Sequence, residues 1–354
     1  MLYNGNLAIT KMFGGPYDIV MFRDGQDGNL IWDWDNPIDI PSGESIGGVE
    51  KQKIYQNKLI LSASHEINVV DMNTGIMLWR SDTQDKGGSG GVRIALINDH
   101  IYHTHKPPGT FVDSSYLVRS SVHQPKWDTI FRLGLDEQGR TPSIQPGVLW
   151  VSPQGDSVYI FQNRGGSNSS DQVDLYALNI QTLEVLWKID SLDTGSCVRP
   201  PLVRNGKVYF SGYRNVFCID AATGSILWKY TVASGLFNTD LIIAENKLIV
   251  HPNLYSTIAA VDLDTGAEIW KKTNTGDSPT DIEYYHGHIF YASGGDGYIY
   301  VHRVSDGKLV KKLRSPNREK YGSALFTRPL AIDPANGRLY CTDGRFAICY
   351  QIKL

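Results

Sequence analysis

The 354-residue chain lacks any run of about 20 apolar residues, the length that a membrane-spanning helix needs. We therefore expect no membrane-spanning segment. The first residues, Met1 to Asn6, have no basic start followed by an apolar stretch, so no signal peptide is visible. The first residues therefore do not identify the cellular compartment. Either the chain is cytoplasmic, or a leader has been removed and a Met substituted for it.

Clustered charge of one sign is also scarce. The net charge is −3, with 34 Lys and Arg against 37 Asp and Glu, and the basic residues are scattered except between 311 and 320. Proteins that bind nucleic acid gather their basic residues into a stripe, so we expect no nucleic-acid partner. The chain also lacks a nucleophile elbow, a P-loop and a dinucleotide fingerprint between a strand and a helix. We predict no catalytic residues and favour a protein that is not an enzyme.

A repeated pattern of residues dominates what is present. An apolar strand is followed by Asp, then by Thr and Gly, and then by an apolar run that ends in Trp79, Trp228 or Trp270; a degenerate copy ends in Trp187. Asp can bond the backbone of a tight turn, and Gly accepts the positive φ that such a turn requires. The pattern predicts a strand, a turn and a strand, with Trp packed between neighbouring repeat units.

Weaker copies at 25–32, 127–131 and 304–310 extend the series, with Val310 at the expected position of Trp. Between two Trp positions the chain offers three more strand-like runs, such as 202–204, 207–211 and 216–219. Four strands in a repeat of about 40 to 50 residues are typical of one propeller blade.

Seven outer-strand positions are followed by three further strand-like runs at 328–332, 338–342 and 346–352. We therefore predict an all-β fold, a single β-propeller domain over residues 1–354 with eight four-stranded antiparallel blades, and seven blades as the alternative. Because propellers remove exposed edges by closing the ring, we expect residues 5–13 to supply the missing strand of the last blade.

The Asp-x-x-Thr-Gly-x-x-x-Trp pattern resembles the repeat of the pyrroloquinoline-quinone-type propellers, which include quinoprotein alcohol dehydrogenases and the outer-membrane assembly lipoprotein BamB. The resemblance implies a scaffold that contacts another protein or protein assembly, in the periplasm, at the cell surface or outside the cell. The dehydrogenases carry a disulfide between adjacent Cys residues against their quinone. This chain has four Cys and no adjacent pair, so we expect no cofactor and predict free, buried thiols at Cys197, Cys218, Cys341 and Cys349.

A charged residue recurs shortly before the strand that should be innermost in each blade. The candidate binding residues at this channel mouth are Arg93, Arg199, Asp240, Asp281 and Arg328, with Thr141 near the same level. Such a ring can hold an anionic small molecule or a peptide terminus. Pairing of these charges with one another is the alternative that we favour, because a narrow polar axis must be satisfied.

Two further sets of residues have weaker patterns. His103 with His105 and His286 with His288 have the spacing that places two imidazoles on one face of a strand, but zinc needs three or four ligands, so we predict no metal site. Trp34, Trp127 and Trp150 are candidates for stacking on carbohydrate, because Trp34 and Trp150 lie off the repeat position and Trp127 holds it only weakly.

Together these features favour a non-catalytic propeller that mediates protein–protein contacts, as a subunit of a larger cell-envelope or extracellular assembly. The alternatives are a carbohydrate-binding or carbohydrate-active propeller and a diverged quinoprotein dehydrogenase. A fold by itself does not imply a function, so the choice among them depends on the site.

Overall fold

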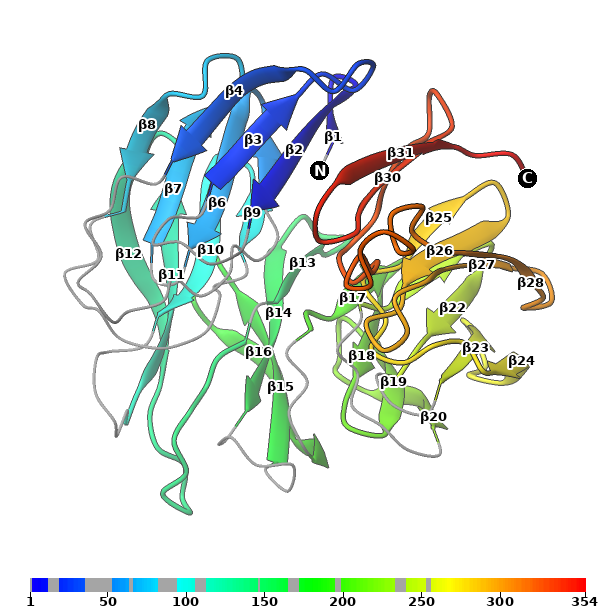
Figure 1. Ribbon diagram of the computed structural model, residues 1–354. Helices are drawn as coiled ribbons and strands as arrows, with labels where there is room; N and C mark the ends of the chain where they lie inside the picture. The colour runs from blue at the N-terminus through cyan, green and yellow to red at the C-terminus, as the bar shows by residue number, and fades with distance from the viewer. Residues whose placement is uncertain are drawn as a thin grey trace. The chain divides into compact units, whose positions relative to one another are not determined.

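The computed structural model describes residues 2–11, 19–35, 53–63, 66–81, 94–105, 113–145, 147–164, 172–194, 199–232, 240–252 and 256–354, and these residues form strands and turns without a helix (Figure 1). None of them forms an apolar helix long enough to cross a membrane. The chain divides into two compact units, residues 1–149 and 150–354. The single-domain organisation therefore stays a prediction.

Unit 1 contains three four-stranded antiparallel sheets. The first consists of β1 (Leu2–Tyr3), β2 (Asn6–Lys11), β3 (Ile19–Arg23) and β4 (Leu30–Asp35); the second of β5 (Lys53–Tyr55), β6 (Lys58–Ala63), β7 (Glu66–Asp71) and β8 (Met77–Arg80); the third of β9 (Ala95–Ile97), β10 (His100–His105), β11 (Ser115–Ser121) and β12 (Gln124–Leu133).

Unit 2 contains four four-stranded sheets and a final sheet of three strands, and its boundary falls within β13. The first four sheets are β13 (Val148–Val151), β14 (Ser157–Arg164), β15 (Gln172–Asn179) and β16 (Val185–Thr194); β17 (Leu202–Arg204), β18 (Lys207–Ser211), β19 (Asn215–Asp220) and β20 (Ile226–Thr231); β21 (Ile242–Ala244), β22 (Lys247–Val250), β23 (Thr257–Asp262) and β24 (Glu268–Thr273); and β25 (Glu283–Tyr285), β26 (His288–Ala292), β27 (Ile299–Arg303) and β28 (Leu309–Leu313). The last sheet consists of β29 (Ala331–Asp333), β30 (Arg338–Thr342) and β31 (Ala347–Gln351).

The eight sheets confirm the predicted all-β propeller with eight blades, and the alternative of seven blades is wrong. The prediction that residues 5–13 complete the last blade is also wrong. Residues Asn6–Lys11 form β2, which pairs with β1 on one side and with β3 on the other. Both edges of β2 are therefore occupied within the first sheet, and the last sheet keeps three strands in the described part of the chain.

The turn before each outer strand forms as its residues predict. Asp262 accepts hydrogen bonds at Oδ1 from the backbone N–H of Asp264 (3.0 Å) and of Thr265 (2.8 Å), and Gly266 takes a φ of +73°. Hydrogen bonds from the Thr265 side chain and backbone lower the pKa of Asp262 and outweigh the opposing effect of burial. In the degenerate copy Leu183 takes the glycine position with a φ of +63°, so the turn survives without Gly at a cost of about 1 kcal/mol in backbone strain.

Each repeat Trp packs onto the turn of the next sheet, as predicted. Trp228 of β20 is 8% exposed, and its indole N–H donates to the carbonyl of Leu263 at 3.0 Å. A Cβ atom built on Gly266 would lie only 2.7 Å from Cδ2 of Trp228, so the ring needs a glycine beneath it. The same donation to a carbonyl of the next sheet occurs at Trp32, Trp79, Trp187 and Trp270.

The register of β27 and β28 shows that the predicted Trp position at Val310 is wrong. Trp270 lies opposite Ala260 across β23 and β24, and the corresponding pair of β27 and β28 is Val301 with Lys311. Lys311, and not Val310, therefore occupies the Trp position in that blade. Both strand pairs have a bulge at the equivalent place, so the bulge does not cause the difference. Lys311 follows Gly307 at the same spacing at which Trp270 follows Gly266, so the count from the turn glycine already points to Lys311.

A substitution at the glycine beneath Trp228 tests this packing. Gly266→Ala should lower the free energy of unfolding by about 3 kcal/mol, because it adds both backbone strain and a clash with the indole. Urea unfolding followed by circular dichroism measures the difference.

The matched control is Gly206→Ala, because Gly206 has a similar φ of +71° and no atom within 4 Å of an added Cβ. This substitution should cost only the backbone term, about 1 kcal/mol. Equal losses for the two variants would contradict a role for the Trp contact.

Candidate functional site

Three of the predicted channel-mouth residues meet in unit 2. The Arg199 guanidinium lies 3.3 Å from Oδ1 of Asp281 and 3.6 Å from Oδ1 of Asp240, both measured from Nη1. Each residue stands just before the first strand of its own sheet, β17, β21 or β25. We call Arg199, Asp240 and Asp281 the rim cluster. Its side chains are 17%, 24% and 21% exposed, so they are held by the protein and still reach solvent.

A fourth sheet fixes the backbone of the rim cluster. The side chain of Gln162, fully buried on β14, donates from Nε2 to the carbonyl of Arg199 at 2.9 Å. Arg199 therefore connects four consecutive sheets of unit 2. Gln162 could not be predicted from the sequence, because a single Gln within a strand has no pattern that distinguishes it.

The other three predicted channel-mouth residues are Arg328, Thr141 and Arg93. Arg328 is half-buried before β29, at the position that the sequence predicted. Thr141 is exposed and lies in unit 1, in the segment that leads to β13. Arg93 lies outside the described residues. The binding role of all six residues stays a prediction.

The rim cluster holds fixed charges in a half-buried setting. An Arg guanidinium is always protonated and can make two parallel bonds to a carboxylate, so a carboxylate of a partner can exchange with Asp240 or Asp281. A basic group of a partner can in turn join the two aspartates. The pairing that we favoured from the sequence is present between Arg199 and both aspartates. The cluster is therefore suited to binding charged groups.

The three candidate Trp residues differ in accessibility. Trp34 packs in the core of unit 1 at 7% exposure, and Trp150 is 8% exposed. Trp127 on β12 is 37% exposed, so its ring is the most accessible of the three. Stacking on a sugar stays a prediction, with Trp127 as its strongest candidate.

The histidine pairs show local contacts. His288 Nδ1 lies 2.8 Å from the carbonyl of His286, and His103 Nε2 lies 3.3 Å from Ser120 Oγ. The side chain of His105 lies outside the described part of the structure. Within the described residues, no group of three or more His, Cys, Asp and Glu side chains is arranged to hold a metal ion.

The cysteines do not fit the quinone site that the resemblance implies. Cys341 and Cys349 lie on paired strands but face Ile348 and Tyr340, so they are not opposite each other. Burial raises the pKa of the Cys218 thiol to about 11 and that of Cys341 to about 12. Cys349 is exposed, which corrects the prediction of a buried thiol, and Cys197 lies outside the described residues. No adjacent cysteine pair exists in the sequence to contact a quinone ring.

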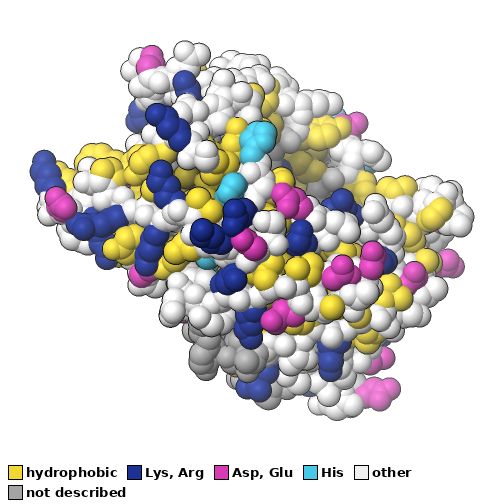
Figure 2. All heavy atoms as spheres, turned by 90° about the vertical axis from the view of Figure 1, so that its right-hand side faces the viewer, with side chains coloured by type: hydrophobic (Ala, Val, Ile, Leu, Met, Phe, Trp, Pro, Cys, Tyr) yellow, Lys and Arg dark blue, Asp and Glu magenta, His cyan; other side chains and the backbone are white. Residues whose placement is uncertain are grey.

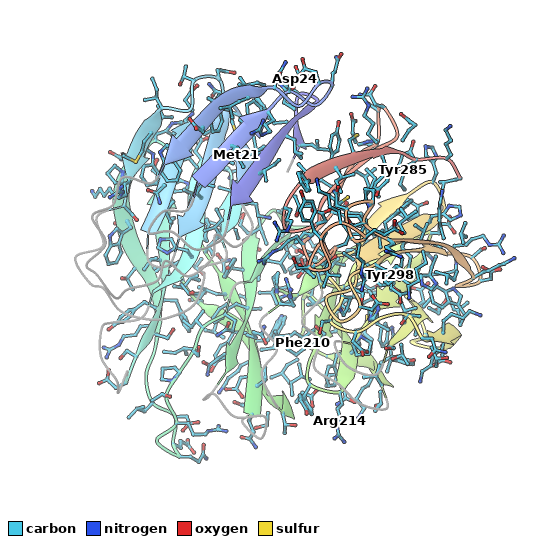
Figure 3. All side chains as sticks on the ribbon, viewed as in Figure 1. Met21, Asp24, Phe210, Arg214, Tyr285 and Tyr298 are labelled. Atoms are coloured by element: carbon cyan, nitrogen blue, oxygen red, sulfur yellow. The ribbon has the colours of Figure 1, made fainter. Side chains whose placement is uncertain are left out.

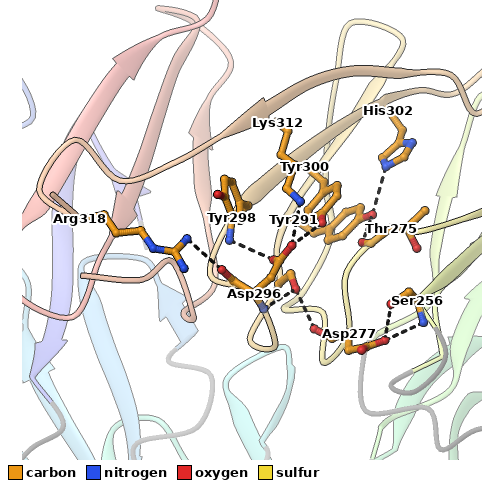
Figure 4. Close-up of polar contacts among 11 residues, drawn as sticks. Ser256, Thr275, Asp277, Tyr291, Asp296, Tyr298, Tyr300, His302, Lys312 and Arg318 are labelled. Carbon is orange, nitrogen blue, oxygen red and sulfur yellow. Dashed lines mark hydrogen bonds and ion pairs between the residues drawn. The ribbon is translucent and has the colours of Figure 1, made fainter. Parts of the chain in front are cut away.

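A second polar cluster lies inside unit 2 (Figure 4). The Tyr291 hydroxyl of β26 donates to the carbonyl of Thr275 at 2.8 Å and lies 3.2 Å from Nε2 of His302. The ring of His251 meets Tyr291 edge-on, with centroids 4.8 Å apart. Burial lowers the pKa of His251 to about 4, against the opposing effect of its bond to the carbonyl of Pro252, and burial also lowers the pKa of His302. Both imidazoles are therefore neutral near pH 7.

The polar cluster continues outward to Asp296 (Figure 4). Asp296 accepts hydrogen bonds at Oδ2 from Tyr300 (2.5 Å) and Lys312 (2.9 Å). Burial acts to raise the pKa of Asp296, but the hydrogen bonds from Tyr300, Lys312, Ser293 and the Tyr298 backbone together outweigh it and hold the pKa below its ordinary value. Lys312 also lies over the rings of Tyr298 and Tyr300, so the aspartate, the lysine and the two tyrosines form one connected group.

Basic and acidic side chains both occur across the face shown in Figure 2. The charges on that face therefore do not form a stripe of one sign. The exclusion of a nucleic-acid partner stays a prediction.

Comparisons with known proteins agree with the repeat. A family model described as outer membrane protein assembly factor BamB matches residues 169–344. The crystal structure of BamB from Moraxella catarrhalis is 14% identical, covers 94% of this chain and 91% of its own, and gives a TM-score of 0.64. The computationally designed Ika8 protein gives 13% identity, 96% and 95% coverage and a TM-score of 0.65. A quinohemoprotein alcohol dehydrogenase from Comamonas testosteroni gives 11% identity, 96% and 68% coverage and a TM-score of 0.66.

At these identities the structural likenesses show the fold alone. A search of curated proteins found no match. The solved structures include a BamB protein, a designed protein and an enzyme, so the fold by itself does not select among the functions.

The buried His251 predicts a dependence of stability on pH. Its pKa in the folded chain, about 4, lies below its ordinary value of 6.5, so unfolding takes up a proton between these values. Stability is full above pH 6.5 and should fall as the pH drops towards 4, by about 3 kcal/mol in total. His251→Gln should flatten this slope in urea midpoints measured from pH 7 to pH 4.

Val250→Ala is the matched control, because Val250 is a buried neighbour that does not titrate. It should lower stability by a similar amount at every pH and keep the slope of the unaltered chain. An unchanged slope in His251→Gln would show that His251 does not carry the effect.

Proposed function

The chain is a β-propeller of the pyrroloquinoline-quinone type, and from this premise we propose that it is a non-catalytic scaffold that binds another protein. The partner binds at the rim cluster through charged side chains. The matching family model is that of an assembly factor of the outer membrane, so the scaffold acts within a cell-envelope assembly.

The observation that carries the proposal is the anchoring of Arg199. Its guanidinium lies between carboxylates from two sheets, and its carbonyl receives a bond from a third sheet through Gln162. Charges that are fixed before the partner arrives lose little conformational freedom on binding. About a fifth of each side chain remains exposed, which leaves an accessible face for the partner.

Reversal of the Arg199 charge tests the proposal. The tagged chain is purified gently from its source cells, and copurifying proteins are quantified by mass spectrometry. We expect a stoichiometric partner with the unaltered chain and a loss of about tenfold or more with Arg199→Glu, because truncating or reversing a half-buried charge costs at least about 1.4 kcal/mol of binding.

The control is Arg214→Glu, which makes the same charge change at an exposed residue on the outside of unit 2 (Figure 3). It should retain the partner. Thermal unfolding must show that Arg199→Glu remains folded; the milder Arg199→Gln replaces it otherwise. A partner held equally by all variants would exclude the rim cluster, and a chain that purifies alone would exclude the scaffold.

Carbohydrate binding is the second candidate, supported by the exposure of Trp127. A glycan array with the unaltered chain and Trp127→Ala distinguishes it. Binding that is lost in this variant would favour the carbohydrate function over the scaffold.

A further inference from the structure

Among the described strands, none pairs with the outer side of the last sheet of unit 2. It contains β29, β30 and β31, whereas each of the other sheets has a fourth strand. In the described part of the chain β31 pairs with β30 alone. An uncovered strand edge presents a row of backbone donors and acceptors that can pair with another chain.

The register shows which backbone groups of β31 face outward. The N–H of Ile352 donates to the carbonyl of Gly337 at 2.8 Å, and Gln351 lies opposite Arg338. This arrangement makes Gln351 and Arg338 a non-hydrogen-bonded pair, and such pairs alternate along an antiparallel ladder. Cys349 is therefore also in a non-hydrogen-bonded position. The N–H and C=O groups of Gln351 and Cys349 point away from β30, towards the outer side of the sheet.

A complete sheet of the same unit provides the template. In the sheet of β17 to β20, Tyr209 lies opposite Cys218, and Cys218 lies opposite Trp228 of the outer strand. In the last sheet Tyr340 lies opposite Cys349 in the same way. The described strands place nothing on the other side of Cys349, where the template has its Trp.

The exposure of the two cysteines reflects this difference. Cys218 is fully buried, and Cys349 is exposed. Beside Cys349, Ile348 and Tyr350 are half-buried and pack against the core of the last sheets. An added strand would cover this edge and shield these apolar side chains further.

We propose that β31 binds an extended segment of a partner protein as the fourth, antiparallel strand of this blade, with a Trp of that segment opposite Cys349. The inference deepens the scaffold role proposed above and takes the existence of a protein partner from it. The chemistry of the segment follows the outer strands of this chain, in which Trp79, Trp187, Trp228 and Trp270 are each followed by Lys or Arg. The occupant is not residues Asn6–Lys11, because both edges of β2 are already paired.

A synthetic peptide with the sequence of residues 223–232, which includes β20, tests the proposal on the full chain. Fluorescence anisotropy of the labelled peptide measures binding. We expect saturable binding and protection of Cys349 from iodoacetamide, read by mass spectrometry at that residue. The matched control peptide has Ala in place of Trp228 and should bind at least about tenfold more weakly.

Two substitutions separate the edge backbone from the thiol. Cys349→Pro removes an outward N–H and should weaken peptide binding at least about tenfold, whereas Cys349→Ser keeps the N–H and should bind as the unaltered chain does. Should Cys349→Pro fail to fold, hydrogen exchange on the unaltered chain decides the question. The amides of Cys349 and Gln351 should exchange fast alone and slowly with the peptide.

Three results would overturn the proposal. These are an absence of peptide binding, equal binding by the Pro and Ser variants, and amides of Cys349 and Gln351 that are protected before peptide is added. The last result would mean that a segment of the chain itself already covers the edge. A partner that copurifies with Cys349→Pro but is lost with Arg199→Glu would reject this inference and leave the scaffold role intact.

Discussion

The packing of one sheet against the next depends on the contact between a Trp indole ring and a turn glycine. The ring of a repeat Trp occupies the space above the turn of the next sheet, and a Cβ atom on the turn glycine there would clash with Trp32, Trp187, Trp228 or Trp270. The indole N–H donates to a carbonyl in the same turn, so the ring is fixed by both packing and a hydrogen bond. Because a single small sheet cannot bury a large apolar area, this contact between sheets provides much of the core.

The position of the rim cluster follows from that packing. Once neighbouring sheets are fixed to one another, the residues before their first strands are brought together, although Arg199 and Asp281 are 82 residues apart in the chain. Charges in such a half-buried place are unfavourable unless they are paired, which is why Arg199 bridges two aspartates. The same residues can serve a partner, because paired charges that remain partly exposed can exchange with charges brought from outside.

The last sheet differs from the other seven, because only three strands of it are present among the described residues. Its strands reproduce the Tyr–Cys pair of an earlier sheet, but the Trp-bearing outer strand that covers this pair elsewhere is not among the described strands. A repeat architecture makes every unit depend on its neighbours for burial, so the outward backbone groups of β31, which no described strand covers, are where we propose that a partner pairs. The two proposed contacts with a partner therefore lie at β31 and at the rim cluster.

The sequence by itself determined the blades, their turns and the packing of the repeat Trp, because each is encoded by a few adjacent residues whose conformation is local. It also identified Arg199, Asp240 and Asp281 as charged residues at equivalent positions. The prediction for residues 5–13 was wrong, because strand pairing depends on neighbouring strands and leaves little trace in the pattern. The prediction for Val310 was also wrong, although the spacing from Gly307 in the sequence already points to Lys311. Only the tertiary structure decided that Arg199 forms ion pairs with both aspartates, that Gln162 supports it, and that Trp34 and Trp150 are buried. It also decided that no described strand pairs with the outer side of β31. These are contacts between segments far apart in the chain, and their geometry is set by how whole sheets pack.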